Sequence, residues 1–460
     1  MSPIPPIPQA DRYWLIQAHV PLPLLVAEIA APLIDSILVA VDIEIAQGQI
    51  RQIVPTGTAD PSNLPSVNLQ RRLVWSGFVD LHTHLDKGHI WPRTANPDGS
   101  FESALTAVQT DREQSWQAED VYRRMEFGLK CSYAHGTHAL RTHIDAMGQQ
   151  AAISLEVFKT LQAVWADRLV LQAASLVPLE YFMTSQGEEL ADRMASVGGV
   201  LGGLPEMNPD LDAQLDRVFT LAQERGLNLD FHTDESGNPT DITLQRVAAA
   251  ALRHGFSGQI VCGHCCSLAV QPLAEVQKTL EWVRQAGIGI VSLPMCNLYL
   301  QDRNQQASRY FSQSAGDALA HLDPFPTQTP RWRGITLVHE LKHAGIPVAF
   351  ASDNCRDPFY AYGNHDGLEV FTQAVRIAQL DAPHSDWCRS VTTIPADLMG
   401  LPTCGRIGIG LPADLIVFHA RYFSELLARP QSDRIVLRRG IPIDTTLPDY
   451  AELDDLVAVE

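Results

Sequence analysis

Two histidines, His82 and His84, end a strongly apolar run that reads Val74-Trp75-Ser76-Gly77-Phe78-Val79-Asp80-Leu81. Successive side chains of a strand point to opposite faces, so two imidazoles two residues apart can reach one metal ion. A single histidine on such a strand is more often a core residue with a hydrogen-bond partner. Two histidines at this spacing, with Asp86 and Lys87 directly behind them, favour a metal site.

Four later segments repeat this pattern of a short apolar stretch followed by polar residues that can do chemistry. Their tips are His143 with Asp145, His232 with Glu235, His264, and Asp353 with Asn354. Three more strand candidates lie between them at 169–177, 197–204 and 288–293, and the stretches 118–131 and 211–225 have the character of amphipathic helices. The sequence therefore predicts eight strands separated by helices.

Functional residues at the carboxyl ends of successive strands are typical of a (β/α)8 barrel, because its βα loops build one face. A doubly wound sheet also places ligands at strand ends, but only around a switch point. Here such residues follow five of the eight predicted strands. We therefore expect an α/β fold with a TIM-like (β/α)8 barrel over residues 73–400.

Both ends of the chain are predicted to be β-rich, with apolar runs at 37–41, 48–54, 413–418 and 434–440. Neither end is large enough for a core of its own, so we expect residues 1–72 and 401–460 to form one small β-sandwich domain. A polar stretch at 301–333 follows the seventh predicted strand. Loops of this length at an active face often act as lids. We expect either a lid or an exposed loop without a role in the site.

The predicted ligands His82, His84, His232 and Asp353 offer three neutral nitrogens and one carboxylate. This set suits zinc or ferrous iron better than calcium or magnesium. Such an ion can lower the pKa of a bound water from about 15.7 to roughly 7. Glu235 could then carry protons between water and substrate, and His264 could hold the hydroxide or polarise a developing oxyanion. The chemistry that these residues predict is hydrolysis.

Taken together, the strand tips resemble the amidohydrolase superfamily, and within it most closely the bacterial cytosine deaminase branch. The resemblance rests on residues 78–86, 141–145, 232–235, 263–264 and 352–359 and extends from about residue 74 to residue 400. It implies one iron or zinc ion per chain, with Asp353 as both a ligand and the proton acceptor from the water. Binuclear relatives carry a carboxylated lysine at the end of strand four, where this chain reads Gly202-Gly203-Leu204-Pro205-Glu206. The absence of that lysine favours a single ion. Glu206 could bridge a second ion, but a solvated loop carboxylate is the simpler interpretation of this residue.

Three positions depart from the cytosine deaminase pattern and are expected to contact the substrate. Leu179 stands where the branch has a glutamine, Asn354 where it has a second aspartate, and Phe359 where it has a tryptophan. Losing the hydrogen-bonding partner of a polar ring edge costs about 1–3 kcal/mol. We therefore expect a more apolar and less charged pocket, with cytosine itself a poor substrate.

Some residues near the predicted site keep two interpretations each. His143 and Asp145 could steady a ligand histidine, or they could simply line the barrel mouth. Lys87 could meet an anionic substrate, although a solvated lysine is the simpler interpretation. The glycine-rich run 405–410 follows a helix instead of a strand, so we expect a turn there and no nucleotide cofactor.

Composition narrows the class of protein further. The 460 residues carry a formal net charge of −19, which argues against nucleic acid and anionic membrane partners. There is no long uncharged apolar run and no signal-peptide pattern at the start, and the eight scattered cysteines indicate reduced thiols. We therefore expect a cytoplasmic enzyme that acts on a small nitrogen heterocycle and has no nucleic acid or membrane partner. The sequence leaves open whether it forms a homo-oligomer.

Three functions are compatible with the sequence. The leading hypothesis is a metal-dependent deaminase that adds water to an amino-bearing carbon of a cytosine-like or related nitrogen heterocycle and releases ammonia. A cyclic amidohydrolase that opens a lactam or imide ring is the alternative, and the missing strand-four lysine counts against it. A non-catalytic scaffold is the third, but such proteins typically lose metal ligands, and this chain keeps its predicted set.

Overall fold

The computed structural model describes residues 5–31, 33–35, 37–303 and 329–457 of the chain. It divides into two compact units. The first unit comprises Met1–Asp80, Leu129–Ala139 and His365–Pro448, and the second comprises Leu81–Gly128, Leu140–Asn364 and Asp449–Glu460. Most of the predicted lid, residues 304–328, lies outside the described residues. The domain limits expected after residues 72 and 400 stay a prediction.

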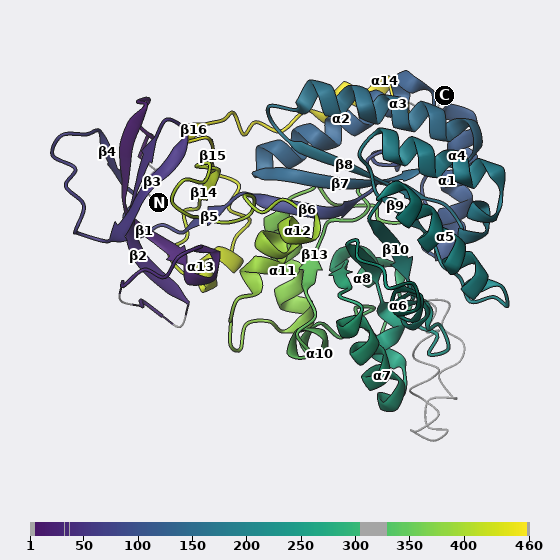
Figure 1. Cartoon of the computed structure of the whole chain (residues 1–460). Coiled ribbons are helices and arrows are strands. Elements are labelled where there is room, and N and C mark those ends of the chain that lie inside the picture. The colour runs from purple at the N-terminus through teal and green to yellow at the C-terminus, as the bar shows by residue number, and fades with distance from the viewer. Residues whose placement is uncertain (1–4, 32, 36, 304–328, 458–460) are drawn as a thin grey trace. The chain divides into compact units, whose positions relative to one another are not determined.

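Strands alternate with helices along the second unit (Figure 1). Strands β9 to β13 form a sheet in the order β13-β12-β11-β10-β9 with parallel neighbours, and a second sheet has the order β6-β7-β8. Isolated parallel bridges link these two sheets, from Thr83 to Asp353 and from Ala174 to Val200. The strands are β6 (Phe78–Thr83), β7 (Thr137–Asp145), β8 (Val170–Leu176), β9 (Leu201–Gly203), β10 (Leu229–Thr233), β11 (Ile260–His264), β12 (Gly289–Ser292) and β13 (Val348–Phe350).

The helices between these strands follow from apolar periodicity and capping, as α5 (Leu211–Arg225) illustrates. Leu211, Leu215 and Val218 recur at three- and four-residue intervals and are buried. Gly226 then takes a left-handed φ of 64° and its N–H bonds back to the carbonyl of Ala222, which ends the helix. The other helices and 3-10 turns here are α1 (Phe101–Ser115), α2 (Ala118–His135), α3 (Gly148–Trp165), η2 (Leu179–Met183), α4 (Ser185–Ser196), α6 (Thr243–His254), η3 (Cys266–Val270), α7 (Leu273–Gln285), α8 (Pro294–Leu300), α10 (Val338–His343), η6 (Tyr450–Leu453) and α14 (Asp454–Val457).

The first unit contains two four-stranded sheets, with orders β3-β2-β1-β4 and β16-β15-β14-β5. Segments from both ends of the chain hydrogen bond to each other, as from Ala413 N to Gly48 O and from Ile50 N to Leu411 O, both at 2.9 Å. The β-sandwich arrangement of these sheets stays a prediction. Their strands are β1 (Arg12–Pro21), β2 (Leu38–Ala46), β3 (Gln49–Pro55), β4 (Ser66–Asn68), β5 (Val74–Ser76), β14 (Leu415–Val417), β15 (Ile435–Arg438) and β16 (Ile441–Pro442). The helical segments are η1 (Leu22–Leu24), α11 (Gly367–Ala378), η5 (Trp387–Val391), α12 (Thr393–Leu398) and α13 (Phe423–Leu427).

The core of this unit gathers around Trp75 of β5. Its indole lies edge-on to Phe371 of α11, with ring centroids 5.3 Å apart, and to Phe418, at 6.0 Å. All three side chains are buried. Aromatic pairs in this geometry contribute about 0.5–1.5 kcal/mol beyond the burial of their area.

Most elements expected from the sequence are confirmed. The helix predicted at 211–225 is α5 with the same bounds, and the one at 118–131 is α2, which continues to His135. The strand expected at 197–204 is shorter, because β9 covers only Leu201–Gly203. Within the described residues, no helix combines the length and the apolar character needed to cross a membrane.

A buried ion pair in the first unit gives a test of its stability. Arg434 contacts both carboxylate oxygens of Asp366, at 2.7 and 2.6 Å, and both residues are buried. Asp366→Asn keeps the side-chain volume but leaves the guanidinium without its counter-charge, so the free energy of unfolding should fall by about 3–5 kcal/mol. Urea unfolding measures the loss. The control Glu425→Gln breaks the exposed pair with Arg421 and should cost less than about 1 kcal/mol. Equal losses in the two variants would contradict this account.

Candidate active site

The first part of the site is the end of β6. His82 lies in the strand and His84 directly follows it, and both are buried. Strand β11 has a glycine beside them, Gly263, where a Cβ atom would lie only 2.9 Å from Cε1 of His82. Only glycine therefore leaves room for this imidazole at its position.

Ligand atoms from three strand ends meet at one point. His232 Nε2 lies 3.1 Å from His82 Nε2 and 3.3 Å from His84 Nε2. Asp353 Oδ1 lies 3.5 Å from His82 Nε2 and 3.2 Å from His84 Nε2. A tetrahedral ion with ligands at about 2.0–2.1 Å holds its donor atoms about 3.4 Å apart. These four separations are close to the spacing of donor atoms around one divalent ion. Groups with metal-ligand spacing include His82, His84 and His232 in one set and His82 and Asp353, with His264, in another.

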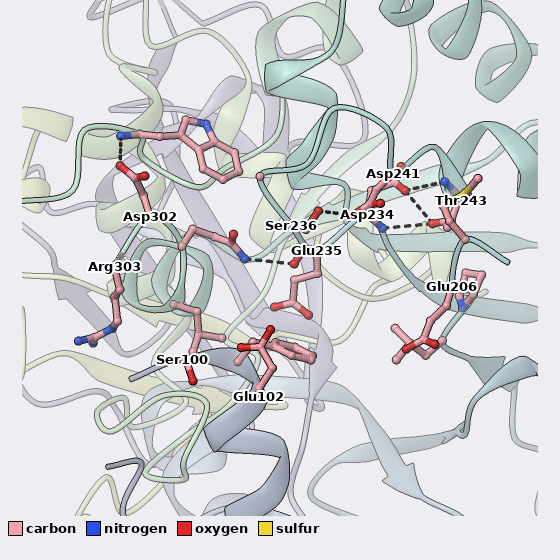
Figure 2. A pocket seen from close by; sticks show the side chains of 18 residues that line it. Ser100, Glu102, Glu206, Asp234, Glu235, Ser236, Asp241, Thr243, Asp302 and Arg303 are labelled. Atoms are coloured by element: carbon pink, nitrogen blue, oxygen red, sulfur yellow. Dashed lines mark hydrogen bonds between the residues drawn. The ribbon is translucent and has the colours of Figure 1, made fainter. Parts of the chain in front are cut away.

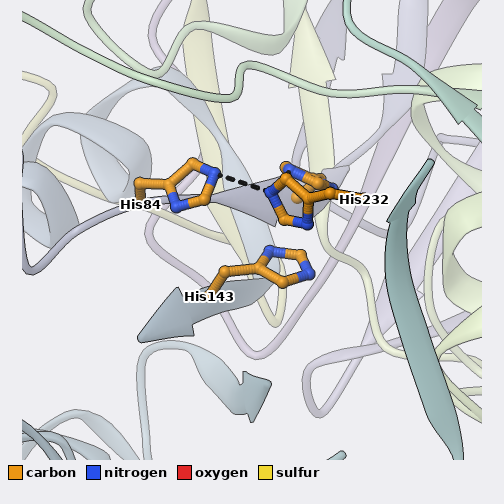
Figure 3. A group of neighbouring side chains, drawn as sticks. His84, His143 and His232 are labelled. Atoms are coloured by element: carbon orange, nitrogen blue, oxygen red, sulfur yellow. Dashed lines mark hydrogen bonds between the residues drawn. The ribbon is translucent and has the colours of Figure 1, made fainter. Parts of the chain in front are cut away.

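A further histidine belongs to this group. His143 of β7 lies with His82, His84 and His232 in a set whose ligand atoms are all within 4.8 Å of one another, and we call these four residues the histidine cluster (Figure 3). The ring of His143 is 4.0 Å from that of His82, between centroids. Its Nε2 also lies 3.2 Å from Asp230 Oδ1, without forming a hydrogen bond to it.

Burial sets the protonation state of the ligands. It lowers the pKa of His82, His84 and His232 well below the usual value, and neighbouring charges lower it further. The imidazoles are therefore neutral at neutral pH, which is the form that binds a metal. Asp353 has a left-handed backbone, with φ of 62°, a conformation that costs about 1–3 kcal/mol and is commonest at functional sites.

Glu235 and His264 form a second pair beside the ligands. Glu235 Oε1 lies 3.2 Å from His264 Nδ1, and the amide of Asn297 in α8 is 3.2 Å from the same carboxylate oxygen and 3.0 Å from the same imidazole nitrogen. Burial raises the pKa of Glu235 well above its usual range, and the Asp353 carboxylate raises it further. The same burial lowers the pKa of His264 to about 3. A carboxyl group with a raised pKa beside a neutral imidazole is suited to proton transfer.

These residues line a cavity of about 180 Å³, which we call the inner cavity. Its polar wall includes His84, His232, Glu235, His264 and Asp353. Its apolar wall comes from other elements and consists of Phe101, Leu105, Val108, Met147, Leu176, Val177, Pro178, Leu204 and Phe359. A flat ring that enters this space would meet apolar surface and the candidate ligands at once.

A second, outer cavity of about 340 Å³ shares Phe101, Leu204, Glu206 and Glu235 with the inner one. Figure 2 shows its labelled polar side chains, which come from well-separated parts of the chain. Glu206, the residue considered for a second ion, is exposed on this wall. Within the described part of the chain, none of the groups with metal-ligand spacing includes Glu206.

The three predicted substrate contacts have different places. Asn354 and Phe359 line the inner cavity, and Leu179 does not. Leu179 is buried at the start of η2 and packs against Gly203. A Cβ atom added to Gly203 would lie only 2.8 Å from Cδ2 of Leu179. The amide of Asn354 donates to Asp357 Oδ2 at 2.7 Å, so its orientation is fixed by a buried carboxyl. The contacts of all three with substrate stay predictions.

The interpretation of Lys87 as a solvated lysine is wrong. Its side chain is buried in the wall of the inner cavity, and Nζ lies 2.7 Å from Asp145 Oδ1. Arg112 lies 3.7 Å from the other oxygen of the same carboxylate. Lys87, Asp145 and Arg112 therefore bring ionisable side chains to the wall of the inner cavity. Whether this pocket is less charged than that of a cytosine deaminase stays a prediction.

Two supporting groups were missed in the sequence. Asn297 follows the seventh strand as the other polar tips follow theirs, and this position could have indicated it. Arg141 is 1% exposed and donates to Asp230 Oδ2 at 2.7 Å, beneath His143. No sequence spacing signals that pair, because its partners come from strands 89 residues apart.

Comparison with known proteins agrees with this geometry. The sequence model of the amidohydrolase family matches residues 191–441. The chain is 49% identical over 451 residues to a pterin deaminase from Rhizobium rhizogenes, covering 98% of both chains. It is 23% identical over 369 residues to an N-isopropylammelide isopropyl amidohydrolase from a Pseudomonas species, covering 77% of this chain and 81% of that protein.

Among solved structures, the fold resembles that of a 5-methylcytosine deaminase from Klebsiella pneumoniae liganded with 5-fluorocytosine. The TM-score is 0.76 at 24% identity, covering 95% of this chain and 98% of the other. The resemblance that the strand tips indicated is confirmed. The family model covers more than half of the sequence and a relative of nearly half identity spans almost all of it, so the chain belongs to the amidohydrolase family.

Proposed function

We propose that this protein is a metal-dependent hydrolytic deaminase that converts a pterin-type ring into its oxo counterpart and releases ammonia. The observation that carries the proposal is the 49% identity to a pterin deaminase over 98% of both chains. Pterin bears an amino group on C2, between two ring nitrogens. Water adds at C2, the bond to the amino nitrogen breaks, and the products are the 2-oxo ring and ammonia.

The inner cavity supports a flat bicyclic substrate. Phe101 and Phe359 meet edge to face, with centroids 5.4 Å apart, on its apolar wall. Candidate ligands and the Glu235 carboxyl lie on its polar wall. A ring between these walls would bury its faces against apolar side chains while its reacting edge met the polar groups.

The metal ligands in this proposal are His82, His84, His232 and Asp353. A bound zinc or iron ion would lower the pKa of a water molecule and so supply a nucleophile at neutral pH. Their donor spacing of 3.1–3.5 Å supports a single ion. The identity of the metal is left open by these ligands, since nitrogen and carboxylate donors suit both ions.

Glu235 and His264 handle the protons and the developing charge. Glu235 takes the first proton of the attacking water and delivers it to the ring nitrogen beside C2 as oxygen adds to that carbon. Asp353 accepts the second proton from the new hydroxyl group, and this proton goes to the amino group as the carbon–nitrogen bond breaks and ammonia leaves. His264 stabilises the negative charge that develops on the oxygen atom that water has added to C2. Asn297 contacts both side chains, at 3.2 and 3.0 Å, and keeps them in position.

We also propose that strands β6 to β13 close into a (β/α)8 barrel. The bridges that link the two sheets at Thr83–Asp353 and Ala174–Val200 support closure. In such a barrel the ends of β6, β10 and β11 and the segment after β13 share one face, which is where the proposed ligands and proton carriers come together.

The first prediction concerns the metal. Purified protein reconstituted with zinc or iron should hold one ion per chain, and His82→Ala should lose it because three donors bind more weakly than four. Elemental analysis after dialysis measures the content. His254→Ala, which changes a histidine on α6 beside Asp216, serves as the control and should keep its ion. Two ions per chain, or none, would contradict the ligand assignment.

The second prediction concerns proton transfer. Glu235→Gln cannot carry a proton, so kcat should fall by about 10²–10⁴-fold while the metal content is unchanged. Glu281→Gln makes the same change on an exposed face of α7 and should leave kcat as it is. A kcat near that of the unaltered protein in Glu235→Gln would assign the proton carrier elsewhere.

The third prediction concerns the substrate. The metal-loaded protein should release ammonia from pterin, with the change in ultraviolet absorbance that accompanies loss of the amino group. Cytosine should be a poor substrate, because the chain departs from the cytosine deaminase pattern at three positions. The proposal fails if pterin is not turned over, or if cytosine has a kcat/KM in the range of about 10⁴–10⁸ M⁻¹s⁻¹ that is usual for good substrates. Ring opening without ammonia release would favour a cyclic amidohydrolase instead.

A further inference from the structure

Lys87 places a positive charge in the wall of the inner cavity. Its side chain is only 5% exposed, and Nζ lies 5.6 Å from the ring centroid of Phe359 on the same wall. Burial by itself would lower the pKa of this amine, but the carboxylates of Asp145 and Asp86 outweigh burial and raise it. The ammonium form therefore persists at neutral pH.

The ammonium of Lys87 has more donors than the one that it gives to Asp145. An ammonium has three N–H donors and no acceptor. Within the described part of the chain, the hydrogen bond found for Lys87 runs from Nζ to Asp145 Oδ1, at 2.7 Å. Buried donors are nearly always satisfied in folded proteins. A substrate in the cavity is therefore positioned to accept from the remaining donors.

The chemistry of the pterin ring supplies two acceptors side by side. The carbonyl oxygen on C4 and the ring nitrogen N5 project from neighbouring carbons on the same edge, and neither carries a hydrogen in the oxidised ring. Cytosine, placed with its amino-bearing carbon at the same point, presents its carbonyl next to a ring N–H. That N–H is a donor, and it would oppose the donors of Lys87.

We propose that Lys87 is a specificity-determining residue whose ammonium donates to both the C4 oxygen and N5 of a pterin-type ring. This inference rests on the proposed function. It explains how a chain without the glutamine of the cytosine deaminase branch can recognise a ring edge, and why a second ring is favoured.

Asp145 acts through Lys87 as a positioning residue. Its Oδ1 accepts from the ammonium, and its backbone N–H donates to Asp86 Oδ2 at 2.8 Å, which fixes the end of β7 against the segment after His84. Arg112 stands 3.7 Å from Oδ2. The Asp145 carboxylate therefore has partners on both oxygens, and its bond to Nζ fixes where the Lys87 ammonium lies in the cavity wall.

The test compares two substrates in two proteins. Pterin and 5-deazapterin, in which a C–H replaces N5, are assayed with the metal-loaded unaltered protein and with Lys87→Met. In the unaltered protein kcat/KM for pterin should exceed that for 5-deazapterin by about 10–100-fold, the effect of one hydrogen bond to a charged group. In Lys87→Met this ratio should collapse, chiefly through loss on pterin. The ratio left in the variant reports any difference in intrinsic reactivity.

Controls separate specificity from damage. Lys278→Met makes the same change on the exposed face of α7 and should keep the original ratio. Metal content should be unchanged in every protein. Lys87→Met leaves the Asp145 carboxylate without this ammonium. If that variant fails to fold for this reason, the assay uses the double variant Lys87→Met with Asp145→Leu, which removes both charges. Removing both partners of a buried pair is far better tolerated than removing one.

Each outcome has a distinct meaning. A substrate ratio that is the same in the unaltered and Lys87 variants, with pterin still a good substrate, overturns the role of Lys87 and leaves the deaminase proposal intact. Absence of pterin turnover in the metal-loaded unaltered protein overturns the proposed function, and the inference about Lys87 falls with it.

Discussion

The proposed site depends on one constraint, which is the close approach of buried polar atoms of His82, His84, His232 and Asp353, with four contacts of 3.1–3.5 Å among them. Lone pairs at this separation repel one another unless a cation or a proton lies between them. An unsatisfied buried polar group costs about 1–3 kcal/mol. Metal binding therefore converts an unfavourable arrangement into a favourable one, and we expect the ion to stabilise the fold as well as to serve the chemistry.

The surrounding structure holds the ligands in this arrangement. Gly263 leaves space for His82, and the Arg141–Asp230 pair lies beneath His143. Asp353 has a left-handed backbone that a strand would not supply, and a parallel bridge from Thr83 fixes the segment that carries it. Contacts from several elements thus hold the proposed ligands, which come from distant parts of the sequence, close to one another.

The two walls of the inner cavity divide the work of recognition and reaction. The proposed proton carrier Glu235 lies with His264 and Asn297. Lys87 lies with Asp145, at the ends of β6 and β7. In the proposed binding mode, turning the ring over would place a ring N–H or C–H against the buried ammonium of Lys87.

The sequence by itself determined the elements and the ligand types. Local apolar periodicity gave α5 its bounds, and the spacing of His82 and His84 indicated a metal, because both signals arise from residues close together in the chain. It misjudged Lys87, whose burial depends on Asp145, 58 residues away. It also could not show that Leu179 packs beside Gly203 at the start of η2, and the contact of this side chain with substrate stays a prediction. Only the tertiary structure decides such questions, because the burial and the partners of a side chain are set by segments that the sequence does not show to be neighbours.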